Sequence, residues 1–220
     1  MTVDATLIAR GLLLDMDSTL VNSDAVVERL WRSWATAHNL LADDVLAVAH
    51  GRQGWATMAE LLPERPVELN LADNARMLAE EITSVEGVVP VAGAPSFMAA
   101  IAHLPHALVT SANSALTDSR MGAAGLPIPA IRVTSESVTF SKPDPEGFLK
   151  AAAELGLSPE DCLVFEDSEA GIAAGKAARM RVIGVGQRAA ALAPTAHVRD
   201  LTQIRVEALA DGVIAVHVRY

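Results

Sequence analysis

Two aspartates, Asp15 and Asp17, stand two positions apart after the first apolar run of the sequence. If the chain turns there, the two carboxylates can converge on one point, where one could attack an electrophile and the other could move a proton. The neighbouring serine and threonine are equally typical of a turn that caps the following helix. This segment alone therefore leaves a chemical and a structural interpretation open.

Two later segments add hydroxyl and amino groups. Thr110 and Ser111 lie in VTSAN, where small side chains would let backbone amides approach a phosphate. Ser111 or Asn113 is also typical of a helix N-cap. Lys142 lies in SKPDP, where two prolines fix its position more firmly than that of an ordinary surface lysine.

A pair of acids, Glu166 and Asp167, follows the apolar run that begins at Cys162. Buried carboxylates are costly unless they meet a cation, and hard oxygen ligands of this kind suit Mg²⁺. Together the four segments offer a nucleophile, a proton donor, a hydroxyl, an ammonium and a metal site. Phosphoryl transfer requires this set, so we favour it over four unrelated structural roles.

A parallel sheet must position these side chains, because ligands of such sheets bind beyond the carboxyl ends of the strands. Short apolar runs alternate with helical patterns along the chain, as in a sheet wrapped by helices. The runs are nearly continuous in apolar character, which fits strands buried on both faces. The predicted strands are residues 11–16, 106–110, 130–134, 162–166 and 182–185.

The interval between the first two strands carries a helical pattern and no strand signal. It contains two sets of residues at helical spacing, Val27, Trp31, Trp34 and His38, and then Leu71, Ala75, Leu78 and Ile82. The sequence therefore predicts a helical domain, residues 21–87, inserted into an α/β core formed by residues 1–20 and 88–220. Glycine and proline at positions 87 and 90 mark the return to the core.

Composition excludes several classes of protein. The 220 residues carry a formal net charge of -10 and are 51% hydrophobic, which excludes a disordered chain and argues against nonspecific binding of nucleic acid. The single cysteine, Cys162, cannot form an intramolecular disulfide or a thiolate zinc cluster. We see no membrane-spanning run and no signal peptide, so we expect a cytoplasmic protein without a membrane partner. The acidic charge argues against a nucleic acid as partner, and we expect a monomer, with an oligomer as the alternative.

The four segments, in this order, resemble the four motifs of the haloacid dehalogenase-like superfamily: DMDST, VTSAN, SKPDP and VFEDSEAGIAAGKAA. The resemblance spans nearly the whole chain and implies a doubly wound parallel sheet with an inserted helical cap. It implies that Asp15 forms an aspartyl-phosphate and that Asp17 is the general acid and base. Thr110 and Lys142 would hold the phosphoryl oxygens.

The same resemblance implies a Mg²⁺ ion bound by Asp15, Asp17, Glu166 and Asp167, with Ser111 and Asn113 near the substrate. One departure is Ser18, where the family usually has glycine. Serine is small enough to fit the turn, so we expect activity to be retained.

The helical insertion resembles the cap of the subgroup that contains β-phosphoglucomutase and small sugar phosphatases. Its predicted substrate contacts are His50, Gly51, Arg52 and Gln53, in a segment similar to the loop with which such caps read the substrate. The alternative is a solvated loop between helices. Mutases of this subgroup carry a histidine ten residues after the general acid, and here that position is Val27, which favours hydrolysis over mutase action. We predict a magnesium-dependent phosphatase for a small phosphorylated metabolite, a sugar or polyol phosphate, with a phosphosugar mutase as the alternative.

Two functions of other classes compete with this prediction. The first is a nucleotide-dependent oxidoreductase, because the segment GVGQRA at 184–189 follows a strand and is similar to a dinucleotide-binding fingerprint. Pro194 interrupts the helix that should follow, and little chain remains for a second βαβ unit, so a turn after the last core strand is preferred. A phosphoacceptor receiver also combines acids, a hydroxyl and a lysine, but it has no helical insertion after the first strand. Titration with NAD and turnover of a phosphate ester would separate these functions.

Overall fold

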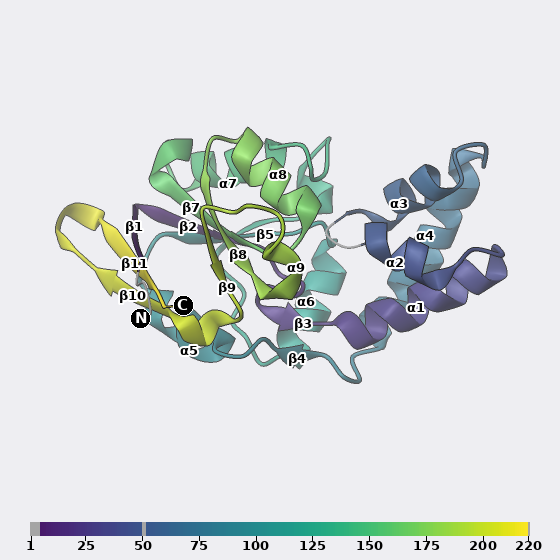
Figure 1. The fold of residues 1–220 in the computed structure, drawn as a ribbon, viewed down its shortest axis with the longest axis horizontal. Coiled ribbons are helices and arrows are strands. Elements are labelled where there is room, and N and C mark those ends of the chain that lie inside the picture. The colour runs from purple at the N-terminus through teal and green to yellow at the C-terminus, as the bar shows by residue number, and fades with distance from the viewer. Residues whose placement is uncertain (1–4, 50–51, 220) are drawn as a thin grey trace.

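The computed structural model describes residues 5–49 and 52–219, and a parallel sheet of six strands forms its centre (Figure 1). Each pair of neighbouring strands is parallel, so the carboxyl ends of all of them lie at one edge. Across the sheet the order is β6 (Ile131–Val133), β5 (His106–Val109), β2 (Gly11–Leu14), β7 (Cys162–Glu166), β8 (Arg181–Val185) and β9 (Ala196–Val198).

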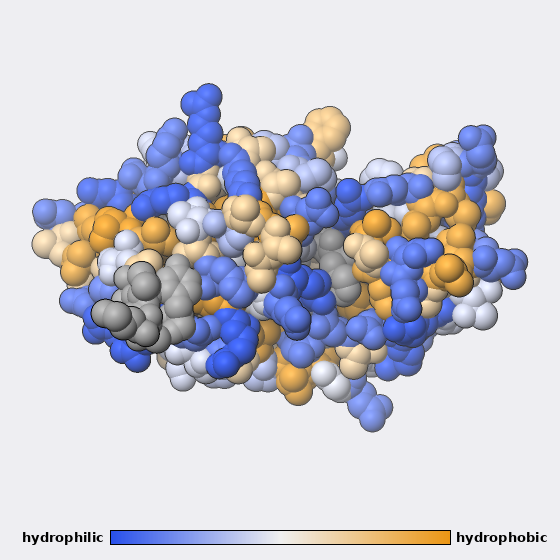
Figure 2. All heavy atoms as spheres, viewed as in Figure 1, coloured by the Kyte–Doolittle hydropathy of each residue, from blue (hydrophilic) through white to orange (hydrophobic). Residues whose placement is uncertain are grey.

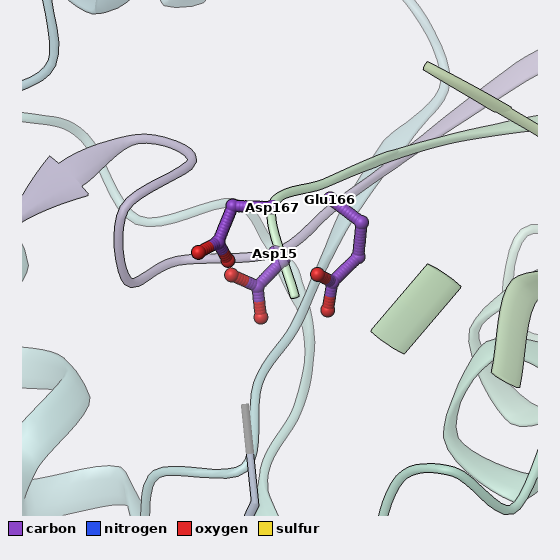
Figure 3. A group of neighbouring side chains, drawn as sticks. All are labelled: Asp15, Glu166 and Asp167. Atoms are coloured by element: carbon purple, nitrogen blue, oxygen red, sulfur yellow. The ribbon is translucent and has the colours of Figure 1, made fainter. Parts of the chain in front are cut away.

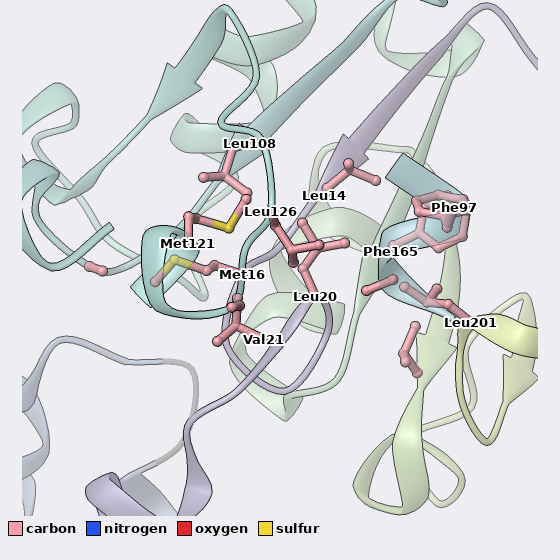
Figure 4. Packing of buried hydrophobic residues seen from close by; sticks show 14 of the residues in the cluster. Leu14, Met16, Leu20, Val21, Phe97, Leu108, Met121, Leu126, Phe165 and Leu201 are labelled. Atoms are coloured by element: carbon pink, nitrogen blue, oxygen red, sulfur yellow. The ribbon is translucent and has the colours of Figure 1, made fainter. Parts of the chain in front are cut away.

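Helices cover both faces of this sheet, and side chains alternate between the faces along each strand. On one face Leu13 packs in a cluster with Phe148, under α7 (Glu146–Glu154) and α8 (Glu169–Ala177). On the other face Leu14 packs beneath α5 (Ala94–Ile101) and α6 (Ser114–Ala123), and the rings of Phe97 and Phe165 lie 5.0 Å apart (Figure 4). Burial on both faces explains why these strands read as continuous apolar runs.

The predicted doubly wound α/β fold is confirmed, and all five predicted strands are present with boundaries within two residues. The expectation that β8 is the last core strand is wrong. A one-turn helix, α9 (Gly186–Ala189), follows it, and β9 then adds a sixth parallel strand. This edge strand has three residues, too few to give a periodic signal.

A second, antiparallel sheet brings together the two ends of the described chain, at the left of Figure 1. Its strands are β1 (Ala5–Ala9), β11 (Ile214–Val218) and β10 (Ile204–Ala208), with β11 in the middle. No strand of this sheet was predicted from the sequence. Only Arg10 separates β1 from β2, so the two strands merge in the sequence, and β10 is an edge strand in which no residue is fully buried.

Four helices lie together at the other end of the molecule, and in Figure 2 the upper outline is indented between them and the sheet. They are α1 (Asp24–Ala37), α2 (Ala42–Ala49), α3 (Gly54–Leu61) and α4 (Val67–Thr83). The chain enters and leaves this group through a two-stranded antiparallel ribbon, β3 (Val21–Asn22) with β4 (Val89–Pro90). Within α1 the rings of Trp31 and Trp34 meet edge to face at 5.5 Å.

The two predicted amphipathic helices correspond to α1 and α4, but the buried side of α4 differs from the prediction. Leu71 is exposed, whereas Asp73 is buried. The reason is a set of polar contacts, in which the Asp73 carboxylate accepts hydrogen bonds from Trp34 Nε1 at 3.1 Å and from Arg65 Nη2 at 2.7 Å. Because these donors satisfy the carboxylate, Asp73 can lie on the buried side of α4, where the prediction placed Leu71.

Short 3₁₀ turns complete the described structure, at Ser135–Ser137, Pro159–Asp161, Leu201–Gln203 and Ala210–Gly212. Among the described helices, none has the length and apolar character needed to cross a membrane.

Candidate active site

The turn after β2 presents Asp15 and Asp17 at the carboxyl edge of the central sheet. The amide of Asp15 still donates to the carbonyl of Phe165 on β7 at 3.0 Å, so Asp15 leaves the sheet in line with its strand. The amide of Leu20 then donates to the carbonyl of Met16 at 2.8 Å and closes the turn. The predicted curl of this segment is therefore present.

Ser18 occupies the one position in this turn where the resemblance leads us to expect glycine. Its φ of 59° lies in the left-handed region, which costs a residue with a Cβ on the order of 1 kcal/mol. Its hydroxyl donates to Asp24 Oδ1 at 2.9 Å and accepts from Arg188 Nη2 at 2.5 Å. These two hydrogen bonds offset the backbone cost and connect the turn to the first residue of α1.

Lys142 lies behind Asp15 and is buried. Its ammonium donates to Asp15 Oδ1 at 2.5 Å, to Glu166 Oε1 at 2.7 Å and to the carbonyl of Val109 at 3.1 Å, which uses all three of its protons. Burial alone would lower the pKa of Lys142, but the charges of Asp15 and Glu166 outweigh it and raise that pKa. Lys142 is thus a permanent cation that fixes one oxygen of Asp15, and its predicted contact with phosphoryl oxygens stays a prediction.

Glu166 is held on both of its oxygens. Besides the contact with Lys142, its Oε2 accepts from the amide of Ser168 at 2.7 Å and from the Ser168 hydroxyl at 2.9 Å. The Ser168 hydroxyl in turn accepts from the amide of Gly171 at 3.1 Å and caps α8. Ser168 therefore both caps the start of α8 and fixes the position of Glu166.

Asp167 completes a group of three buried carboxylates with Asp15 and Glu166, which offer oxygens within 4.8 Å of one another (Figure 3). Burial raises the pKa of Asp167 to about 7; the charge of Glu166 adds to the rise and Arg188 opposes it. Burial also raises the pKa of Asp15 well above its usual value, against the pull of Lys142. Three carboxylates facing two cations leave an excess of negative charge, so this donor set fits a divalent cation with oxygen ligands.

The side chain of Asp17 lies outside this carboxylate group. Its Oδ1 accepts from the Ser23 hydroxyl at 2.7 Å and pairs with Arg120 Nη1 at 2.8 Å. Its predicted contact with the metal therefore stays a prediction. Within the described part of the chain, Oδ2 of Asp17 has no hydrogen-bond partner and is available to a substrate.

The segment after β5 contributes three of the predicted residues to the same site. Thr110 is buried, and its hydroxyl accepts from the amide of Ala112 at 3.1 Å, which leaves the hydroxyl proton available as a donor. Asn113 caps α6 by accepting from the amide of Leu116 at 2.9 Å. Thr110, Ser111 and Asn113 all line one pocket with Asp15 and Asp17, so the structure brings them together.

A pocket of about 290 Å³ lies between this edge of the sheet and the four helices. Asp15, Asp17 and Asp167 line it from the sheet, and Arg52 and Gln53 line it from the helices. Gln53 accepts a hydrogen bond from Trp55 Nε1 at 2.6 Å, and Arg52 forms an ion pair with Glu60. The predicted contacts His50 and Gly51 lie outside the described residues.

Comparison with known proteins identifies the family of this chain. Residues 9–179 match the family model for haloacid dehalogenase-like hydrolases. The chain belongs to the haloacid dehalogenase-like hydrolase family. This membership confirms the resemblance of the four motifs.

Curated relatives of this haloacid dehalogenase-like hydrolase include sugar and polyol phosphatases. Hexitol phosphatase A of Escherichia coli K12 is 38% identical over 178 residues, which cover 80% of this chain and 82% of that protein. Fructose-1-phosphate phosphatase YqaB of the same strain is 28% identical over 180 residues, with 80% and 95% covered. These relatives confirm the prediction that the chain is an enzyme of the phosphatase class.

The fold of the hydrolase is also that of solved family members. β-Phosphoglucomutase from Clostridium difficile matches it with a TM-score of 0.78 and 17% identity, over 90% of this chain and 93% of that chain. At this identity the match confirms the fold alone.

Two charged residues of the hydrolase pocket, Arg120 and Glu81, were not predicted from the sequence; they form an ion pair at 2.6 Å. A signal for Arg120 does exist in the sequence. It stands four residues after Leu116 and one before Met121, so it falls on the buried side of α6. A charge on the apolar side of a helix indicates a buried partner. Glu81 had no such signal, because acids crowd its part of α4.

Proposed function

We propose that this hydrolase is a magnesium-dependent phosphomonoesterase that cleaves a small sugar or polyol phosphate through an aspartyl-phosphate on Asp15. The observation that carries this proposal is the state of Asp15, which lines the pocket and has one oxygen held by Lys142. Its other oxygen has no hydrogen-bond partner among the described residues and is available as a nucleophile. Residues 1–20 and 88–220 would form the catalytic core, and residues 21–87 the cap.

In the first half-reaction, the free oxygen of Asp15 attacks phosphorus and the bond from phosphorus to the ester oxygen breaks. Protonated Asp17 gives its proton to that ester oxygen, which leaves as an alcohol. Thr110 can donate its hydroxyl proton to a phosphoryl oxygen. Lys142 donates to Asp15 Oδ1 and orients the carboxylate for this attack.

In the second half-reaction, Asp17 is a carboxylate and accepts a proton from water. The water oxygen attacks phosphorus, and the bond between phosphorus and Asp15 breaks. Inorganic phosphate is released, Asp15 is again a carboxylate, and Asp17 is again protonated. Both protonation states of Asp17 are thus used once in each cycle.

The metal site proposed here uses Asp15, Glu166 and Asp167, with Asp17 as a further predicted ligand. When bound, Mg²⁺ would supply positive charge that stabilises the phosphoryl oxygens in the transition state. Because Glu166 already accepts three hydrogen bonds, the oxygens of Asp167 are more available to the metal than those of Glu166.

Two observations support a sugar or polyol phosphate and hydrolysis over mutase action. The cap wall of the pocket carries Arg52, Gln53 and Asn74, which suit a ligand with several hydroxyls. Val27 also lines the pocket, and this is the position where mutases of the subgroup carry a proton-shuttling histidine. An aliphatic side chain at that point cannot pass a proton between two hydroxyls of a bound sugar.

Phosphate release from a panel of phosphorylated metabolites tests the proposal, together with rapid acid quenching to trap a phosphorylated Asp15. We expect a hexitol or ketose phosphate to be preferred and a labelled aspartyl-phosphate to accumulate briefly. The Asp15→Asn variant should keep its circular dichroism spectrum and lose turnover, because an amide is not a nucleophile. Wild-type turnover by that variant would contradict the covalent mechanism. Purification from the cytoplasmic fraction and sedimentation would test the predicted location and monomeric state.

A further inference from the structure

Arg120 connects the proposed acid and base to the cap through a single guanidinium group. It belongs to α6 of the core, and only 4% of its side chain is exposed. Nη1 lies 2.8 Å from Asp17 Oδ1, and Nη2 lies 2.6 Å from Glu81 Oε2. Glu81 belongs to α4, so the two acids that share this arginine come from different parts of the fold.

Two donors hold the same oxygen of Asp17. Ser23 and Arg120 both bind Oδ1, which prevents the carboxyl group from rotating freely about its last bond. The other oxygen, Oδ2, is the one without a partner among the described residues, and Asp17 lines the pocket. A proton donor positioned in this way presents one defined oxygen to the leaving group.

The place where Glu81 holds Arg120 is itself fixed. The residues next to both partners form a second contact, in which the Ser119 hydroxyl donates to the carbonyl of Ile82 at 2.6 Å. These adjacent pairs lie near the end of α4, just before the chain returns to the core through β4. The guanidinium is therefore anchored where the cap and the core are joined.

We propose that Arg120 is a positioning residue for Asp17, that Glu81 anchors it, and that proton transfer in this enzyme therefore depends on the contact between α4 and α6. This inference rests on the proposed function, because it assumes that Asp17 is the acid and base. The competing explanation is a purely structural ion pair that joins the two helices. A structural pair would affect every step and every substrate alike.

Leaving-group dependence separates the two explanations. A sugar or polyol alkoxide needs a proton as it leaves, whereas p-nitrophenolate is stable without one. Loss of acid catalysis should therefore slow phosphorylation of Asp15 by a hexitol phosphate and spare phosphorylation by p-nitrophenyl phosphate. Hydrolysis of the aspartyl-phosphate still needs Asp17 as a base, so p-nitrophenyl phosphate should show a rapid first turnover followed by a slow steady state.

The experiment compares wild type with Arg120→Met, Arg120→Lys and Glu81→Gln by rapid quench on sorbitol 6-phosphate and p-nitrophenyl phosphate. Since general acid catalysis contributes about 10²–10⁴-fold, we expect Arg120→Met to slow the first turnover of sorbitol 6-phosphate by about 30–300-fold. Its first turnover of p-nitrophenyl phosphate should change by less than about threefold, with a burst of one product per site. Arg120→Lys should recover part of the loss, and Glu81→Gln should show the same contrast more weakly.

Two controls make each outcome decisive. Arg132→Met removes another arginine–aspartate pair of this region, with Asp118 of α6, and should leave both substrates unaffected. Asp17→Asn should show the full leaving-group contrast.

Suppose that Asp17→Asn shows the contrast, but that the folded Arg120 or Glu81 variants slow both substrates equally or slow neither of them. The positioning role is then overturned, and the proposed function stands. If Asp17→Asn itself shows no contrast, the acid and base role in the proposed function is overturned and the inference with it.

Discussion

A Cβ atom on Gly171 would lie 1.6 Å from Oε1 of Glu166, so this glutamate occupies the space that any other residue at position 171 would need. Glu166 cannot easily move away, because Lys142 and Ser168 hold both of its oxygens. The glycine in the fourth motif is therefore required by the position of an acid five residues earlier.

Gly171→Ala should destabilise the protein and displace Glu166. Overpacking of this kind costs about 1–3 kcal/mol, which exceeds the gain of roughly 0.5–1 kcal/mol from replacing glycine by alanine in a helix. We expect a lower midpoint of chemical denaturation and a large loss of phosphatase activity. The matched control is Gly122→Ala in α6, where a Cβ meets nothing within 4 Å and a small stabilisation is expected. Equal midpoints for the two variants would contradict this account.

The sequence predicts this region well because its chemistry and its packing are local. β7 ends at Glu166 as predicted, and the paired acids, the capping serine and the glycine follow within five residues. The turn after β2 is equally local. In both places hydrogen bonds within one short segment form the turn.

What the sequence did not reveal depends on contacts between distant segments. Arg120 contacts Glu81, which lies 39 residues away in the sequence, and Arg188 contacts Ser18, which lies 170 residues away. No spacing rule connects such pairs, because the register of strands and the docking of helices decide which side chains meet. The pairing of β1 with β11, from the opposite end of the chain, is long-range in the same way.

Removal of Asp167 should weaken magnesium binding more than it weakens the fold. Asp167→Ala deletes one of three carboxylates but also removes mutual repulsion, so the metal-free variant should be at least as stable as metal-free wild type. Isothermal titration with MgCl₂ should give an affinity lower by about tenfold or more, which corresponds to roughly 1.4 kcal/mol or more. EDTA should stop wild-type turnover and added MgCl₂ should restore it. Turnover that ignores EDTA would remove the metal from the mechanism.

The stability of the metal-free protein should fall as pH rises from about 5 to 8, because its folded state holds protons that the unfolded state releases. The pKa of Asp167 is raised to about 7 in the fold, whereas an unfolded aspartate has a pKa near 3.9. Between these values the folded state binds more protons, so each step up in pH favours unfolding. Urea denaturation in EDTA at several pH values should show this slope, and Asp167→Asn should reduce it. A stability that rises over this range would contradict the assignment.

Ser18→Gly should relieve the backbone strain at this position and should also remove two hydrogen bonds. Glycine adopts the φ of 59° without the Cβ penalty, but the variant loses the contacts with Asp24 and Arg188. These effects are of similar size, so the change in unfolding free energy should stay within about 1 kcal/mol. Arg188 would keep its contact with Asp167 at 3.0 Å, and phosphatase activity should change by less than about threefold. Loss of activity would instead show that the serine hydroxyl has a role in catalysis.

Arg52→Ala should discriminate between substrates, because Arg52 lines the pocket from the helices while the proposed phosphoryl contacts come from the sheet. A lost charged hydrogen bond is worth roughly 1.5–3 kcal/mol, so kcat/KM for the best sugar or polyol phosphate should fall by about ten- to a hundred-fold or more. p-Nitrophenyl phosphate offers no hydroxyls, so its first turnover and its steady state should both change by several-fold at most. This pattern differs from that of Arg120→Met, which should leave a burst followed by slow turnover on the same ester.

Glu60→Gln provides the matched control for Arg52, because it removes the charge of the partner in the Arg52 ion pair and keeps the arginine itself. If Arg52 reads the substrate, this variant should lose much less kcat/KM on the sugar phosphate than Arg52→Ala does. Equal losses for the two variants would mean that the ion pair with Glu60 maintains α3 and that substrate contact is not the reason for the effect. Equal losses on both esters would place Arg52 in the common chemistry, and unchanged kinetics on both would make it a solvated residue at the rim of the pocket.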